Sequence, residues 1–128
     1  MTAQGRILII EDNQNIVFVE KLCLEANGYT VNVAADGISG LDKALAEHPD
    51  LIILDLILPK LNGYLVLEAM QNNPLTKNIP VLVTSARAQA ADVKQAYSYQ
   101  IAGYLIKPFT HLELLDKVNQ IAHRKDEI

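Results

Sequence analysis

The sequence predicts an α/β fold in which helices cover both faces of a parallel, doubly wound sheet of five strands. Five short runs of mostly apolar, often β-branched residues suit strands that are buried on both faces. Five other segments carry apolar residues at helical spacing. The two kinds of segment alternate, which is typical of parallel sheets because each connection between parallel strands needs a crossover, usually a helix.

The length and composition fit one globular domain. With 128 residues, 50% of them apolar and 20% charged, the chain can bury roughly two thirds of its unfolded surface without disulfides or metal staples. No linker, repeat or low-complexity segment divides it, so we expect a single domain over residues 1–128. The net charge of -4 and the lack of a Lys/Arg cluster argue against direct nucleic-acid binding, which needs a basic face.

Cysteine content and the N-terminal residues bear on location. Cys23 is the only cysteine, which excludes an internal disulfide and a cysteine metal site. Its place in a helical apolar pattern predicts a small buried hydrophobe. The first five residues are too short and polar for a signal peptide, and no apolar run reaches membrane-spanning length. We therefore expect a cytoplasmic protein that does not bind membranes.

The first two strands are expected at residues 6–10 and 29–34. The helix between them ends at Gly28, and the next helix cannot continue past Pro49. The expected apolar face of the first helix consists of Ile16, Val19, Leu22 and Cys23. That of the second consists of Ile38, Leu41, Ala44 and Leu45.

The third apolar run, from Leu51 to Leu58, contains one acidic residue, Asp55. An ionised carboxyl taken out of water costs several kcal/mol unless cations or hydrogen-bond donors meet it. We therefore expect Asp55 at the C-terminal end of the strand, where the chain opens into a loop and where α/β sheets bind ligands. The alternative is that Asp55 only caps a turn.

The second half of the chain continues the alternation. The expected helices are Leu65–Met70, which follows Gly63 and stops near Asn73-Pro74, the alanine-rich segment Ala88–Tyr97, and Leu112–Ile121, which Thr110 and Glu113 begin. The expected strands are Ile79–Thr84 and Tyr104–Ile106.

Polar residues stand at the predicted strand ends, and the C-terminal ends of parallel strands lie along one edge of a sheet. They are Glu11 and Asp12, Asp55, Thr84 and Lys107. Each has an ordinary structural explanation, such as a helix-start acid, a strand threonine or a surface lysine. Their joint occurrence at successive strand ends favours a site.

The carboxylates of this set predict a magnesium site. Three acids close together repel one another unless a cation lies among them, and Mg2+ takes hard oxygen ligands. No Gly-rich fingerprint or Walker lysine is present, which disfavours nucleotide or flavin binding. An aspartate beside a divalent ion can attack a phosphoryl group, whose oxygens the Lys107 ammonium and the Thr84 hydroxyl would help to neutralise.

Four motifs together resemble the receiver domain of two-component response regulators, the chemotaxis-regulator-like family. They are Ile-Leu-Ile-Ile-Glu-Asp-Asn at 7–13, Leu-Asp-Leu-Ile-Leu-Pro with Gly63 at 54–63, Thr84-Ser85-Ala86, and Tyr-Leu-Ile-Lys-Pro-Phe at 104–109. The resemblance covers about residues 5–124 and implies a flavodoxin-like sheet with strand order 2-1-3-4-5.

The resemblance also implies a role for each site residue. Asp55 would accept a phosphoryl group from a sensor histidine kinase or phosphotransfer protein and would not act as an enzyme on other molecules. Mg2+ would be held by Glu11, Asp12, Asp55 and the backbone carbonyl of Ile57. Lys107 would pair with the phosphoryl group, and its bond to Pro108 is expected to be cis.

A conformational switch is implied as well. Thr84 would swing toward the phosphorylated aspartate, and Tyr104 would follow inward. This movement would change the surface of the fourth helix, fifth strand and fifth helix, which a downstream protein or a second copy of the chain would read.

Some residues near the site depart from the family pattern. Gln100-Ile101-Ala102-Gly103 replaces the usual residues before the fifth strand, and the preceding Tyr97 and Tyr99 are expected to pack inward rather than form a docking patch. Ile57 and Ala86 offer no polar group to orient water, which predicts slow self-dephosphorylation. We expect His48, His111 and His123 on the surface, outside the site.

Two other functions compete with the switch. A degenerate receiver would be a phosphorylation-independent docking module, and the complete set of site residues argues against it. An aspartate-based phosphatase typically needs a second acid two residues after its nucleophile, where Ile57 stands. The sequence does not distinguish a stand-alone switch from a receiver excised from a longer regulator.

Overall fold

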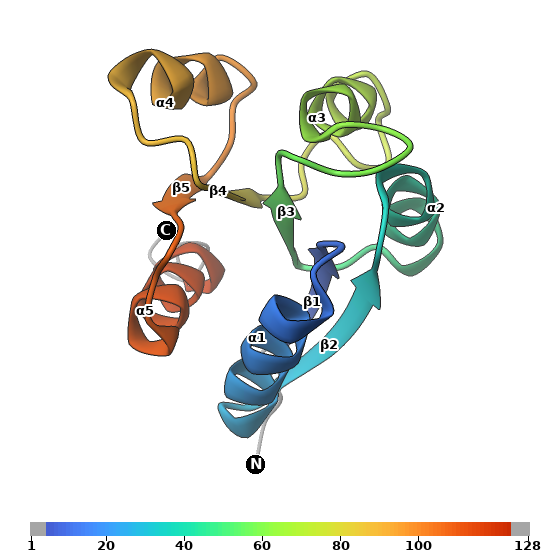
Figure 1. Ribbon diagram of the computed structural model, residues 1–128. Coiled ribbons are helices and arrows are strands. Elements are labelled where there is room, and N and C mark those ends of the chain that lie inside the picture. Colours follow the sequence, from blue (N-terminus) through green and yellow to red (C-terminus); the bar gives the residue numbers. More distant parts are fainter. Residues whose placement is uncertain (1–4, 124–128) are drawn as a thin grey trace.

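The structure is a computed structural model that describes residues 5–123 (Figure 1). Its strands are β1 (Gly5–Ile10), β2 (Tyr29–Ala34), β3 (Leu51–Asp55), β4 (Val81–Ser85) and β5 (Gly103–Ile106). Its helices are α1 (Gln14–Ala26), α2 (Gly37–Glu47), α3 (Gly63–Gln71), α4 (Ala90–Tyr97) and α5 (His111–Ala122). The five strands form one parallel sheet in the order β2-β1-β3-β4-β5, which confirms the predicted fold class and strand order.

Helices cover both faces of this sheet, with α2, α3 and α4 on one side and α1 and α5 on the other (Figure 1). Residues along each strand alternate between two apolar clusters because successive side chains point to opposite faces. In β3, Ile52 and Leu54 belong to the cluster under α2 and α3, whereas Leu51 and Ile53 belong to the cluster under α1 and α5. Burial on both faces explains why the strands read as continuous apolar runs.

The buried face of α1 differs from the prediction. Val19 and Leu22 are 55% and 60% exposed, whereas Glu20 and Leu24 are buried. Because residues 16–19 are all apolar, their spacing fits more than one helix face, and packing against the sheet selects the face that contains Val17 and Leu24. Cys23, predicted to be buried, is only half-buried.

Several element boundaries and surface positions also differ from the prediction. β4 begins at Val81 rather than Ile79, and α4 begins at Ala90 rather than Ala88. Tyr97 is 48% exposed, so the prediction that it packs inward was wrong. Tyr99 does pack against the core, with its ring centroid 5.6 Å from that of Tyr64.

The predicted surface histidines are exposed: His48, His111 and His123. Among the helices of residues 5–123, none combines the length and apolar character that crossing a bilayer would need.

Candidate functional site

The parallel strands bring the predicted polar residues to one edge of the sheet. Asp55 is the last residue of β3, and its register partner on β4 is Thr84. Glu11 directly follows β1, and Lys107 directly follows β5. Glu11, Asp55 and Thr84 are 3%, 7% and 2% exposed, which makes this a buried polar site rather than a scatter of surface charges.

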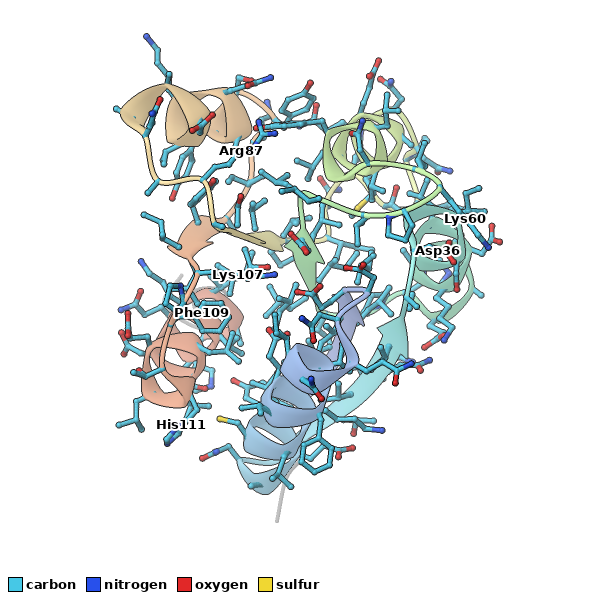
Figure 2. The ribbon with its side chains drawn as sticks, in the orientation of Figure 1. Asp36, Lys60, Arg87, Lys107, Phe109 and His111 are labelled. Atoms are coloured by element: carbon cyan, nitrogen blue, oxygen red, sulfur yellow. The ribbon has the colours of Figure 1, made fainter. Side chains whose placement is uncertain are left out.

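Lys107 joins two of the carboxylates. Its Nζ donates to Glu11 Oε1 at 2.6 Å and to Asp55 Oδ2 at 3.2 Å, and Figure 2 shows its side chain reaching toward β3. The other two oxygens accept backbone hydrogen bonds: Glu11 Oε2 from the Asn13 N–H at 3.2 Å, and Asp55 Oδ1 from the Ile57 N–H at 3.1 Å. Every oxygen of both buried carboxylates therefore has a donor.

Burial and ion pairing shift the pKa values of Glu11 and Lys107. Burial raises the pKa of Glu11 above its ordinary value, because desolvation outweighs the hydrogen bond from Lys107. Burial alone would lower the pKa of Lys107, but the hydrogen bond to Glu11 and the negative charge of Asp55 raise it. The site thus holds a cationic lysine and one carboxyl group that is costly to ionise.

The acidic residues of the site fit a hard divalent cation. Glu11, Asp12 and Asp55 can each offer one carboxylate oxygen, and these oxygens all lie within 4.8 Å of one another. Two of the residues are buried and Asp12 is exposed, so the cluster reaches the surface on one side. Oxygen ligands from one or more carboxylates, with room for water, are what Mg2+ prefers.

Gly63 shapes the loop that follows Asp55. Its N–H donates to the Leu56 carbonyl at 2.9 Å. A Cβ at this position would lie 2.5 Å from Leu56 Cα and 2.8 Å from the Asp55 carbonyl oxygen. Only glycine allows the start of α3 to approach the Asp55 backbone this closely.

The other end of the site is fixed by β4 and β5. The Lys107 N–H donates to the Ser85 carbonyl at 2.8 Å, and the Lys107–Pro108 bond is cis. Tyr104 is buried, and its hydroxyl donates to the Arg87 carbonyl at 2.8 Å. The ring of Tyr104 is therefore already turned inward in this conformation and holds the loop between β4 and α4.

Sequence reasoning missed one buried acid near the site, Glu20 on α1. It is 3% exposed, and its Oε2 has no hydrogen-bond partner. Burial, and then the negative charge of Glu11, raises its pKa to about 8. Its position four residues before Leu24 was the available signal, because residues four apart share a helix face.

Comparison with known proteins agrees with the fold. The response regulator receiver domain family matches residues 7–119, and the chain belongs to this family. Receiver domains bind Mg2+ at an acidic pocket and generally accept a phosphoryl group. Membership of this family implies histidine kinases as partners.

The chain is also similar to individual proteins. It is 41% identical over 123 residues to the DNA-binding dual master transcriptional regulator RpaA of Synechocystis, covering 96% of this chain and 51% of that protein. It is 36% identical to the response regulator ArlR of Staphylococcus epidermidis, covering 94% and 54%. The chain therefore spans about half the length of these curated relatives.

Solved structures share the fold over almost their whole length. The chemotaxis response regulator CheY4 of Vibrio cholerae superposes with a TM-score of 0.87 at 26% identity, covering 94% of this chain and 99% of that one. The receiver domain of the Francisella response regulator 1452 gives a TM-score of 0.89 at 28% identity, covering 94% and 98%.

Proposed function

We propose that this chain is a phosphorylation-dependent signalling switch whose Asp55 accepts a phosphoryl group from a histidine kinase or phosphotransfer protein. The observation that carries the proposal is the position of Asp55 at the end of β3, beside two acids and a lysine. An aspartate in this setting is oriented by the Ile57 N–H and neutralised by Lys107. One of its oxygens can attack the phosphorus atom of a phosphohistidine donor, and the donor's imidazole leaves as its P–N bond breaks.

We propose that Glu11, Asp12 and Asp55 hold Mg2+, with the backbone carbonyl of Ile57 as a further ligand. The bound ion would neutralise charge on the phosphoryl oxygens. Lys107 would then stay with the phosphoryl group, and the Thr84 hydroxyl, one strand away in register with Asp55, would supply a second contact.

The chain is proposed to be a phosphoacceptor rather than an enzyme acting on other molecules. A phosphatase mechanism typically needs an acid two residues after Asp55, where the exposed and apolar Ile57 stands. Ala86, on the other side, is exposed and equally apolar. With no side chain at either position to orient water, we expect the acyl phosphate to hydrolyse slowly.

The proposed output surface is formed by α4, β5 and α5. Thr84 would move toward the phosphoryl group, and Tyr104, inward in the conformation described above, would be held there. The surface has exposed apolar side chains for a partner to read, Tyr97, Ile106 and Leu112. A downstream protein, or a second copy of the chain after phosphorylation, is the proposed partner.

Three further proposals concern the chain as a whole. We expect residues 1–128 to form one receiver domain, and the family assignment supports a cytoplasmic location. We also propose that this chain does not itself contact nucleic acid, since its net charge is -4. RpaA is named as DNA-binding, but the chain covers only 51% of that protein.

The test is incubation with acetyl phosphate and Mg2+, followed by intact-mass measurement. The switch predicts the gain of one phosphoryl group, which Asp55→Asn or a chelator abolishes. Asp42→Asn, a matched change at an exposed aspartate of α2, should leave the gain intact. A protein that gains no phosphoryl group under these conditions would instead be the phosphorylation-independent docking module.

A further inference from the structure

The hydroxyl of Tyr64 is a buried polar group that lacks a hydrogen bond. Tyr64 lies in the first turn of α3, on the side of the sheet that α4 also covers (Figure 1). Its hydroxyl oxygen is inaccessible to solvent, and no group of residues 5–123 hydrogen-bonds to it. Burying a polar group without a partner is unfavourable, and such groups are few in folded proteins. A second conformation that gives this hydroxyl a partner would therefore be favoured by it.

The Tyr64 side chain is held in place by its surroundings. The N–H of the preceding Gly63 donates to the Leu56 carbonyl at 2.9 Å, which fixes the start of α3 against the loop that follows Asp55. The ring centroid of Tyr64 lies 5.6 Å from that of Tyr99, just beyond the end of α4, with the two planes tilted by 40°. Tyr64 therefore cannot bring its hydroxyl to solvent without disturbing α3 or the Tyr99 ring.

Tyr104, the switch tyrosine of the proposed function, is a neighbour of this hydroxyl. Tyr64 packs against the same apolar cluster that contains Tyr104. Burial raises the pKa of Tyr64 above its ordinary value, Tyr104 raises it further, and Arg87 lowers it, so these groups are close enough to interact. The Tyr104 hydroxyl donates to the Arg87 carbonyl at 2.8 Å. In this inward conformation, the carbonyl is thus bonded to Tyr104 rather than to Tyr64.

We propose that the Tyr64 hydroxyl opposes the inward position of Tyr104 and so sets how strongly phosphorylation of Asp55 must favour that position. Outward rotation of the Tyr104 ring would free the Arg87 carbonyl and admit water beside Tyr64, so that the Tyr64 hydroxyl gains a partner. The inward conformation withholds that partner, and phosphorylation must supply the difference in free energy. Tyr64 is thus a positioning residue that acts through Tyr104, and its role rests on the switch proposed above.

The test measures how tightly beryllofluoride, an analogue of the phosphoryl group, binds to the whole chain in saturating Mg2+. Tyr64→Phe removes only the hydroxyl and favours the inward position, so the dissociation constant of beryllofluoride should fall by up to about fivefold. Tyr97→Phe, the same change at an exposed tyrosine of α4, should leave the dissociation constant unchanged. An unchanged or larger dissociation constant for Tyr64→Phe overturns the proposal.

Tyr104→Ala separates an effect that passes through Tyr104 from a general effect on stability. Without the Tyr104 ring, water would reach the Tyr64 hydroxyl in both states of the chain. Adding Tyr64→Phe in this background should therefore no longer change the dissociation constant of beryllofluoride. The same decrease in both backgrounds would contradict a role through Tyr104.

The Tyr104 ring gives a readout that does not depend on the phosphoryl site. In NMR spectra of the unmodified wild type, this ring should exchange between inward and outward positions, and the ratio of outward to inward molecules should fall about fivefold in Tyr64→Phe. If the wild type binds no beryllofluoride, the phosphoacceptor function fails, and these ratios still decide the role of Tyr64. Equal ratios in the two proteins, or a single position of Tyr104 in the wild type, overturn the proposal.

Discussion

Lys107 is the residue on which the buried charges of the site depend. Its side chain is 17% exposed, while those of its partners Glu11 and Asp55 are 3% and 9% exposed. Removing one member of a buried ionic group is strongly destabilising, because the remaining charges lose their compensation. The clustering of these residues could be predicted from their places at strand ends. Their burial could not, since it depends on how the loop backbone at Asn13 and Ile57 and the Lys107 side chain meet around the carboxylates.

Lys107→Met is therefore expected to lower the free energy of unfolding by about 3 kcal/mol at neutral pH in a chelator. Mg2+ should restore part of the loss, since a bound cation would again neutralise Glu11 and Asp55. Urea unfolding with and without Mg2+ measures both effects. Lys94→Met, at an exposed lysine of α4, serves as the control and should change stability little.

Glu20 should make stability depend on pH in a defined range. Its carboxyl has an ordinary pKa of 4.5 and a pKa of about 8 in the fold, so the folded state holds the proton more tightly. Its contribution is fully present below pH 4.5 and is lost as pH rises through about 8. Relative to Glu20→Gln, the wild type should lose on the order of 5 kcal/mol across this range in a chelator.

Urea midpoints of wild type and Glu20→Gln, measured at a series of pH values, check this expectation. The two stability curves should diverge toward alkaline pH, with the variant the more stable. Parallel curves would show that Glu20 ionises as freely in the folded chain as in the unfolded one.

At the scale of single elements, strands were easier to predict than helix faces. A strand buried on both sides needs only an apolar run, and β1 and β3 carry such runs. The face of α1 depends instead on which side meets the sheet, and four consecutive apolar residues, 16–19, leave that open. Packing against the sheet determines which face of α1 is buried, so the spacing of Val19 and Leu22 was misleading.

Substitutions of two leucines on α1 test which face of this helix is buried. Leu24 is fully buried and Leu22 is 60% exposed. Leu24→Ala should cost about 2–4 kcal/mol of unfolding free energy, because it leaves a cavity against the sheet. Leu22→Ala should change stability by less than about 0.5 kcal/mol. Equal losses of unfolding free energy for the two variants, in thermal or urea unfolding, would indicate that α1 buries the face that the sequence spacing predicted.

The turn into α3 gives a second prediction at this scale. Gly63→Ala would place a methyl group against the Leu56 backbone, which cannot move aside as a side chain can. We expect a loss of about 1–3 kcal/mol in urea unfolding and slower phosphorylation by acetyl phosphate, since the loop carrying Ile57 must shift. Gly103→Ala, whose added methyl would meet only the ends of Leu82 and Ile121, should lose less stability and keep the phosphorylation rate.

At the scale of the whole molecule, the alternation of strands and helices was enough to predict the parallel sheet and the gathering of polar residues at one of its edges. Parallel strands end at the same edge, so residues as distant in the sequence as Glu11 and Lys107 come within 2.6 Å. The strand order came from the family resemblance rather than from the residues. The burial of Glu20 was not predicted, because its spacing from Leu24 is only one of several spacings that fit the apolar residues of α1.

The most direct measurement of the central claim is to locate the phosphoryl group itself. Reduction of an acyl phosphate with borohydride turns an aspartyl phosphate into homoserine, which peptide mass spectrometry identifies by position. After treatment with acetyl phosphate and Mg2+, homoserine should appear at Asp55 and should be lost in a chelator. Homoserine at Asp12 instead, or at no aspartate, would contradict a phosphoacceptor at the end of β3.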